Sequence, residues 1–120
     1  DFITGVQEKY NVLIIKLTID SAEGALRNQY FKDFGIRWVP VAKKKNQTMI
    51  DMVTSLLAQG RFFYLDHENN KIFIEEHKMY RYDEKTIKTP EPKVIKEDDH
   101  TVDEFKYFVL DNAKLLGLKV

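Results

Sequence analysis

The sequence predicts an alternating α/β fold with a mainly parallel sheet, for three reasons. Residues 12–19 form an almost unbroken aliphatic and β-branched run, as in a strand buried on both faces. Strand-like runs alternate with segments of helical spacing and lead to a helix rich in carboxylates. At 120 residues, with 43% hydrophobic and 32% charged residues, the chain has the size and composition of a globular domain. We therefore expect one domain over residues 1–120.

The first elements lead to an acidic side chain. Residues 6–10 are expected to end a helix, and the strand over residues 12–19 ends at Asp20. Open α/β sheets place their chemistry at the carboxyl ends of central strands, so Asp20 is a candidate functional residue. Alternatively, Asp20 or Ser21 caps the helix expected over residues 22–31. The two roles are compatible.

A second strand and a basic turn follow. Gly35 is expected to end the helix, and residues 36–41 are typical of a strand in which Pro40 favours an edge position or an early end. Three consecutive lysines come next: Lys43, Lys44 and Lys45. A basic run of this length is commonly a solvated loop, but in the turn before a helix its amide and ammonium groups could bind a phosphate.

The middle of the chain contains a helix with a wide apolar stripe, expected from about Thr48 to Ala58 and ended by Gln59 and Gly60. We place this stripe in the core: Met49, Ile50, Met52, Val53, Leu56 and Leu57. Residues 61–65 have the composition of a short strand.

Two interpretations remain open for residues 66–80. One is a hairpin whose second strand covers residues 71–75, and the other is a helix that is capped by Asn69 or Asn70 and ends at Tyr80. The inner face of such a helix is expected to contain Ile72, Glu76, Met79 and Tyr80.

Residues 82–96 are polar, and Pro90 and Pro92 lie around a turn. Residues 85–88 and 93–96 could pair as the two arms of a lysine-bearing ribbon. Beside an acidic site such a ribbon would guide DNA. The alternative is an ordinary surface loop.

The last helix carries several carboxylates at its start. Its apolar residues recur at steps of three and four, which places them on one helix face. These residues are Val102, Phe105, Val109, Ala113 and Leu116. Gly117 is expected to end the helix, and Thr101 with Glu104 is expected to form a capping box at its start.

His100 and Asp103 have no role in that capping pattern. Residues three apart across a helix start lean toward the same point, so together they offer an imidazole and a carboxylate to a divalent cation. If Asp20 converges with them, the three form a two-metal phosphoryl-transfer site. Oxygen ligands there favour Mg²⁺ or Mn²⁺, and the histidine favours Mn²⁺. The alternative is that acidic residues at a helix N-terminus simply suit the helix dipole.

Composition excludes several other classes of protein. Lys plus Arg and Asp plus Glu both total 19, so no global charge attracts nucleic acid or a membrane. The absence of cysteine excludes disulfides, thiolate nucleophiles and zinc–thiolate sites, and it fits a reducing compartment. No apolar run approaches the roughly 20 residues that span a bilayer.

Four segments also occur in an informative order: residues 19–23, 35–43, 75–80 and 99–107. The most specific is the Asp-His-x-x-Asp pattern that begins at Asp99 and leads into an aromatic helix. Together they resemble the C-terminal nuclease domain of the large terminase subunit of tailed bacteriophages. The resemblance implies an RNase H-like fold, with a mixed central sheet flanked by helices, and favours a helix before Tyr80. It also implies cleavage of concatemeric viral DNA during packaging into the prohead.

The resemblance assigns roles to particular residues. It implies that Asp20 is the strand-end metal ligand, that Asp103 is the helix-borne ligand, and that His100 is a ligand or a proton-transfer group. These three residues would be catalytic, with Mn²⁺ or Mg²⁺ as the cofactor. The lysines at positions 43, 44 and 45 match a basic position close to DNA. The family has a further aspartate on its first strand, upstream of the matched region, so we expect this chain to lack the first strands.

The implied partners are double-stranded viral DNA, a terminase ATPase domain in the same parent chain, the terminase small subunit and the portal. The implied location is the cytoplasm of the host cell, with no membrane. A Gly-rich phosphate-binding loop is absent from the sequence, so the ATPase itself is not expected here. Two alternatives to the nuclease stay open: a non-catalytic RNase H-like module that binds DNA or a packaging partner, and an unrelated α/β domain with a coincidental motif.

Overall fold

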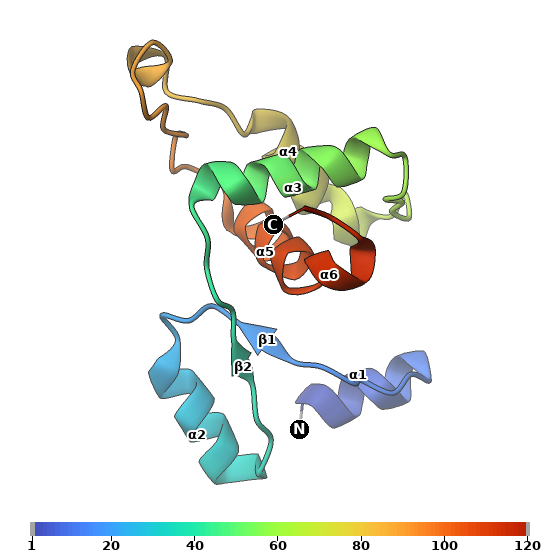
Figure 1. The fold of residues 1–120 in the computed structure, drawn as a ribbon. Coiled ribbons are helices and arrows are strands. Elements are labelled where there is room, and N and C mark those ends of the chain that lie inside the picture. Colours follow the sequence, from blue (N-terminus) through green and yellow to red (C-terminus); the bar gives the residue numbers. More distant parts are fainter. Residues whose placement is uncertain (1, 120) are drawn as a thin grey trace. The chain divides into compact units, whose positions relative to one another are not determined.

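The computed structural model describes residues 2–119, which form two compact units, Asp1–Lys44 and Lys45–Val120 (Figure 1). The first unit contains α1 (Phe2–Tyr10), β1 (Thr18–Ile19), α2 (Gly24–Phe34) and β2 (Val39–Pro40). The second contains α3 (Asn46–Ala58), the 3₁₀ helix η1 (Glu68–Asn70), α4 (Lys71–Met79), the 3₁₀ helix η2 (Glu84–Thr86), α5 (His100–Asp111) and α6 (Ala113–Leu116). None of the helices among the described residues is both long and apolar enough to cross a membrane.

The sheet of the first unit consists of β1 and β2, which pair in parallel. The amide of Val39 donates to the Leu17 carbonyl at 2.8 Å, and the amide of Val41 donates to the Ile19 carbonyl at 3.0 Å. Pro40 lies between them and has no N–H, but in a parallel ladder its nitrogen faces away from β1, so the pairing loses nothing. A strand that contains Pro40 is therefore confirmed, but it covers only Val39–Pro40 and not the expected residues 36–41.

The prediction of a long buried strand over residues 12–19 is wrong. Only Thr18 and Ile19 form strand, and several apolar side chains before them are exposed to solvent, with Leu13 80% and Ile15 92% exposed. A strand needs a partner for its backbone groups, and within residues 2–119 only the short β2 pairs with this segment.

Helix α2 follows its prediction at the C-terminus. Gly35 adopts a left-handed conformation (φ 66°), and its amide donates to the Phe31 carbonyl at 2.8 Å, which ends the helix. Tyr30 packs against Phe34 and Trp38, with ring centroids 4.9 and 5.8 Å apart, and so fixes α2 to the segment that leads into β2.

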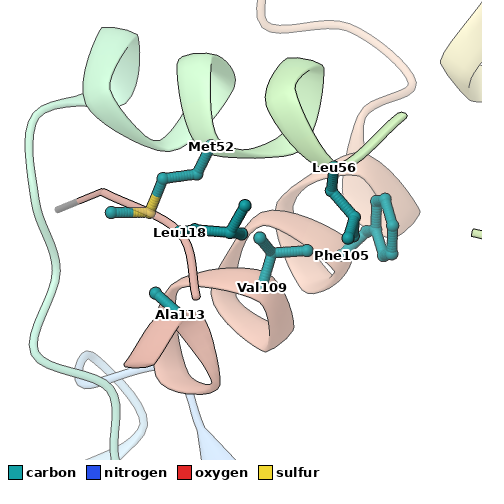
Figure 2. Packing of buried hydrophobic residues seen from close by; sticks show 6 residues of the cluster. All are labelled: Met52, Leu56, Phe105, Val109, Ala113 and Leu118. Atoms are coloured by element: carbon teal, nitrogen blue, oxygen red, sulfur yellow. The ribbon is translucent and has the colours of Figure 1, made fainter. Parts of the chain in front are cut away.

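The core of the second unit lies where α3 packs on α5 and α6 (Figure 2). Five of its buried members come from the two predicted apolar stripes, and the sixth, Leu118, follows α6. The five are Met52, Leu56, Phe105, Val109 and Ala113. Val109 at the centre is fully buried. The periodicity of both helices is therefore confirmed, except that Leu57, expected inside, is 48% exposed. Gly60, with positive φ, follows the end of α3 as predicted. The last helix, expected to continue to Gly117, is divided at Asn112 into α5 and α6, and Gly117, also with positive φ, ends only α6.

The segment after α3 is not the predicted strand. Residues 61–65 form no strand, and Phe63 and Leu65 are 84% and 72% exposed. Phe62 turns inward instead, with its ring centroid 4.6 Å from that of Phe105. An aromatic-rich segment without a partner strand thus contributes one ring to a helical core.

The helical interpretation of residues 69–80 is confirmed by η1 and α4, and the hairpin is excluded. The predicted inner face is partly wrong, because Ile72 and Met79 are 64% and 49% exposed. Phe73 and His77 pack toward Phe105 instead, with ring centroids 5.4 and 5.6 Å away.

A ribbon does form before α5, with different arms from those expected. Tyr82 pairs with Val94 in an antiparallel bridge, and the Asp83 amide donates to the Lys93 carbonyl at 2.7 Å. The first arm thus covers residues 81–83, because residues 84–86 coil into η2.

Candidate functional site

The start of α5 is capped from another helix. Thr101 is the second residue of α5 and is not its cap, so the predicted capping box with Glu104 is wrong. The Thr101 amide and hydroxyl donate to Glu76 Oε1 of α4, at 2.8 and 2.5 Å. These two hydrogen bonds, and the charge of His100, lower the pKa of Glu76 below its usual value. The contact fixes the first turn of α5, which carries the candidate residues.

Asp103 lies on this first turn between two lysines. Its Oδ1 is 3.0 Å from Lys106 Nζ, and its Oδ2 is 3.2 Å from Lys96 Nζ. Lys96 Nζ is also 2.5 Å from Oδ2 of Asp99, the residue just before α5. The carboxylates of Asp99 and Asp103 therefore share one ammonium group. Burial alone would lower the pKa of Lys96, but its bonds to these two carboxylates outweigh burial and raise it, so Lys96 stays protonated.

Lys106 occupies the buried side of Asp103, and only 4% of its side chain is exposed. Its ammonium group donates to Asn46 Oδ1 at 2.5 Å and to the Tyr80 hydroxyl at 3.1 Å. Sequence reasoning missed this residue. The available signal was a lysine four residues after the buried Val102, within the apolar stripe of the helix.

His100, the first residue of α5, is exposed. Its charge acts on Glu76, and within residues 2–119 no hydrogen bond joins its side chain to Asp103. In the same part of the chain, no three His, Cys, Asp or Glu side chains gather as a metal-binding group. The structure thus brings Asp99, Asp103 and two lysines together, and it leaves His100 beside them at the helix start.

Asp20 follows β1 in the first unit. Its Oδ1 accepts a hydrogen bond from the Ala22 amide at 3.0 Å and lies 2.5 Å from Lys43 Nζ. The bond to Lys43 and the bond to Ala22 lower the pKa of Asp20, so its carboxylate is ionised. The alternative that Asp20 caps α2 is wrong, because Glu23 is the capping residue and Asp20 instead closes the preceding turn.

The three consecutive lysines differ in their surroundings. Lys43 is engaged with Asp20, whereas Lys44 and Lys45 are exposed, and Lys45 directly precedes α3. The expected position in the turn before this helix is correct.

Comparison with known proteins now defines the class. Residues 5–111 match the family described as "Terminase RNAseH like domain", and the chain belongs to this family. A solved structure of the large terminase of a thermophilic bacteriophage is similar to 95% of this chain, with a TM-score of 0.72 and 21% identity. The chain spans 28% of the length of that structure. The expected RNase H-like fold is therefore confirmed. A search among curated proteins found no match.

Proposed function

We propose that this chain is the metal-dependent endonuclease domain of a viral DNA-packaging terminase, which cuts concatemeric double-stranded DNA by phosphodiester hydrolysis. The observation that carries the proposal is the start of α5. There, in a chain of the terminase RNase H-like family, the carboxylates of Asp99 and Asp103 converge on one cationic group. Carboxylate oxygens that already surround a positive charge suit a hard divalent cation.

Asp20 and Asp103 are the proposed ligands of Mn²⁺ or Mg²⁺, with His100 as a third ligand or as a proton carrier. A bound divalent cation would supply a water nucleophile at neutral pH and charge neutralisation for the phosphodiester. Asp20 suits its role because its lowered pKa keeps it ionised. His100 is exposed at the helix start, where its imidazole is accessible to a metal ion or to a substrate.

Lys43, Lys44 and Lys45 are the proposed contacts to the DNA backbone. Lysine ammonium groups bind phosphates without reading the base sequence. Lys43 would also remain paired with Asp20, while the exposed Lys44 and Lys45 have their ammonium groups available to phosphates. The further proposed partners are an ATPase domain in the same parent chain, the small subunit and the portal, in the host cytoplasm.

The test is nicking of supercoiled plasmid by the full-length protein that carries this chain, in MnCl₂, MgCl₂ or EDTA. We expect cleavage with Mn²⁺, none in EDTA, and loss of cleavage in Asp103→Asn. The matched control is Asp51→Asn, which makes the same chemical change at an exposed residue of α3.

Cleavage that survives EDTA would contradict the metal dependence. Equal cleavage by Asp103→Asn and Asp51→Asn would remove Asp103 from the site. A folded protein that binds DNA and never cuts it would favour the non-catalytic binding module.

A further inference from the structure

Lys106 is a charged residue in a place where the fold needs an apolar one. It lies on α5 between the buried Phe105 and the half-buried Tyr107, and only 3% of the residue is exposed. Removing an ammonium group from water is costly unless all of its donors find partners. A buried lysine of this kind is therefore expected to have several hydrogen-bond or ionic partners.

The ammonium group of Lys106 makes two hydrogen bonds and one salt bridge, with partners from three parts of the second unit. Asn46 begins α3, Tyr80 follows α4, and Asp103 lies one turn earlier on α5, at distances of 2.5, 3.1 and 3.0 Å from Nζ. Asn46 also donates to the Tyr80 hydroxyl at 3.3 Å, so the two neutral anchors hold each other. The ring of Tyr80 adds a cation–π contact, with its centroid 5.3 Å from Nζ.

This arrangement gives the two oxygens of Asp103 different surroundings. Oδ1 is bound on the buried side by Lys106, whose side chain is 4% exposed. Oδ2 lies nearer to Lys96, whose side chain is 61% exposed and which also reaches Oδ1 at 3.4 Å. The buried lysine cannot move without breaking two further bonds, whereas the exposed lysine can leave. Oδ2 is thus the oxygen that can be freed for another cation.

We propose that Lys106, anchored by Asn46 and Tyr80, is a positioning residue that holds Asp103 by Oδ1 and so leaves Oδ2 as the oxygen that would bind a divalent cation. The inference rests on the proposed function, in which Asp103 is a metal ligand. Groups that orient a ligand from behind commonly change metal affinity by 10–100-fold when they are lost.

The test changes the anchors and leaves every charge in place. Removing Lys106 would also remove a positive charge that repels the metal, so the two effects would oppose each other. Tyr80→Phe removes one hydroxyl and keeps the ring, and Asn46→Ala removes the other anchor. In each variant the ammonium group of Lys106 loses one of its two neutral partners, so it holds Asp103 less firmly. We expect each to weaken Mn²⁺ binding about tenfold.

The readout is Mn²⁺ affinity, measured by electron paramagnetic resonance in the full-length protein that carries this chain. The affinity compared is that of the Mn²⁺ site that Asp103→Asn removes. Tyr82→Phe is the matched control, because it also removes one hydrogen-bonded hydroxyl from a tyrosine, and that hydroxyl binds Gln47 instead of Lys106. Melting temperatures of all variants separate loss of stability from loss of metal binding.

Failures of the two proposals can be told apart. If Asp103→Asn removes no Mn²⁺ site, the proposed function fails. If it removes one, but Tyr80→Phe and Asn46→Ala bind Mn²⁺ as tightly as Tyr82→Phe, the positioning role fails and Lys106 is structural. Should Asn46→Ala not fold, Tyr80→Phe, which loses a single hydroxyl, decides the question alone.

Discussion

Truncating Val109 tests whether the helix that carries Asp103 is held by the core described above. Val109 is fully buried at the centre of the cluster, so Val109→Ala deletes two methyl groups that contact only protein. At about 0.8 kcal/mol per buried carbon, the lost transfer free energy is about 1.6 kcal/mol. The cavity left behind adds on the order of 1 kcal/mol. We therefore expect the free energy of unfolding to fall by about 2 to 3 kcal/mol.

The assay is urea unfolding followed by circular dichroism at 222 nm, with the midpoint and the slope fitted separately. Leu115→Ala is the control, because it deletes more carbon atoms from a residue of α6 that is 84% exposed. This variant should lose less than about 0.5 kcal/mol. A larger loss in Leu115→Ala than in Val109→Ala would refute the packing of α5 described here.

Three further predictions concern charge. Lys43→Met should raise the pKa of Asp20, measured by carbon NMR, because the salt bridge that lowers it is lost; an unchanged pKa would contradict that pairing. The pKa of Glu76 lies below its usual 4.5, so its bonds to Thr101 stabilise the protein above that pH and are lost as pH falls through the lowered pKa. Glu76→Gln should therefore be less stable at pH 7 and lose less stability between pH 5 and 3, by urea unfolding. Lys96→Gln should tighten Mn²⁺ binding, because it removes the ammonium group that occupies both carboxylates, whereas unchanged affinity would show that Lys96 does not compete.

Helical periodicity predicted the parts of the fold that depend on local sequence. The stripe from Val102 to Ala113 is buried as expected, because residues three and four apart share a helix face in any context. The glycine at position 35 ends α2 for an equally local reason, its positive φ. The prediction of a strand from the apolar run before Asp20 is wrong because a strand needs a partner elsewhere in the chain, and periodicity carries no information about that partner.

The same contrast between local patterns and distant partners explains which residues of the candidate site could be predicted. Asp103 stands out in the sequence because it lies in a short local pattern with His100. The side chains that hold the start of α5 are distant in sequence. Glu76 accepts a hydrogen bond from the Thr101 amide, 25 residues away, and Lys106 donates to Asn46, 60 residues away. Nothing in the local pattern marks those side chains, so the buried network around Asp103 became visible only in the folded structure.

The central claim is that Asp20 and Asp103 serve one metal-dependent cleavage reaction. It is tested most directly by plasmid nicking in MnCl₂ with Asp20→Asn, Asp103→Asn and the double variant. Asp33→Asn is the control for the first unit, since it makes the same change at an exposed residue of α2. We predict that either single variant cuts no faster than the protein in EDTA, and that the double variant is no slower. Cleavage by Asp20→Asn at the rate of Asp33→Asn would contradict the claim.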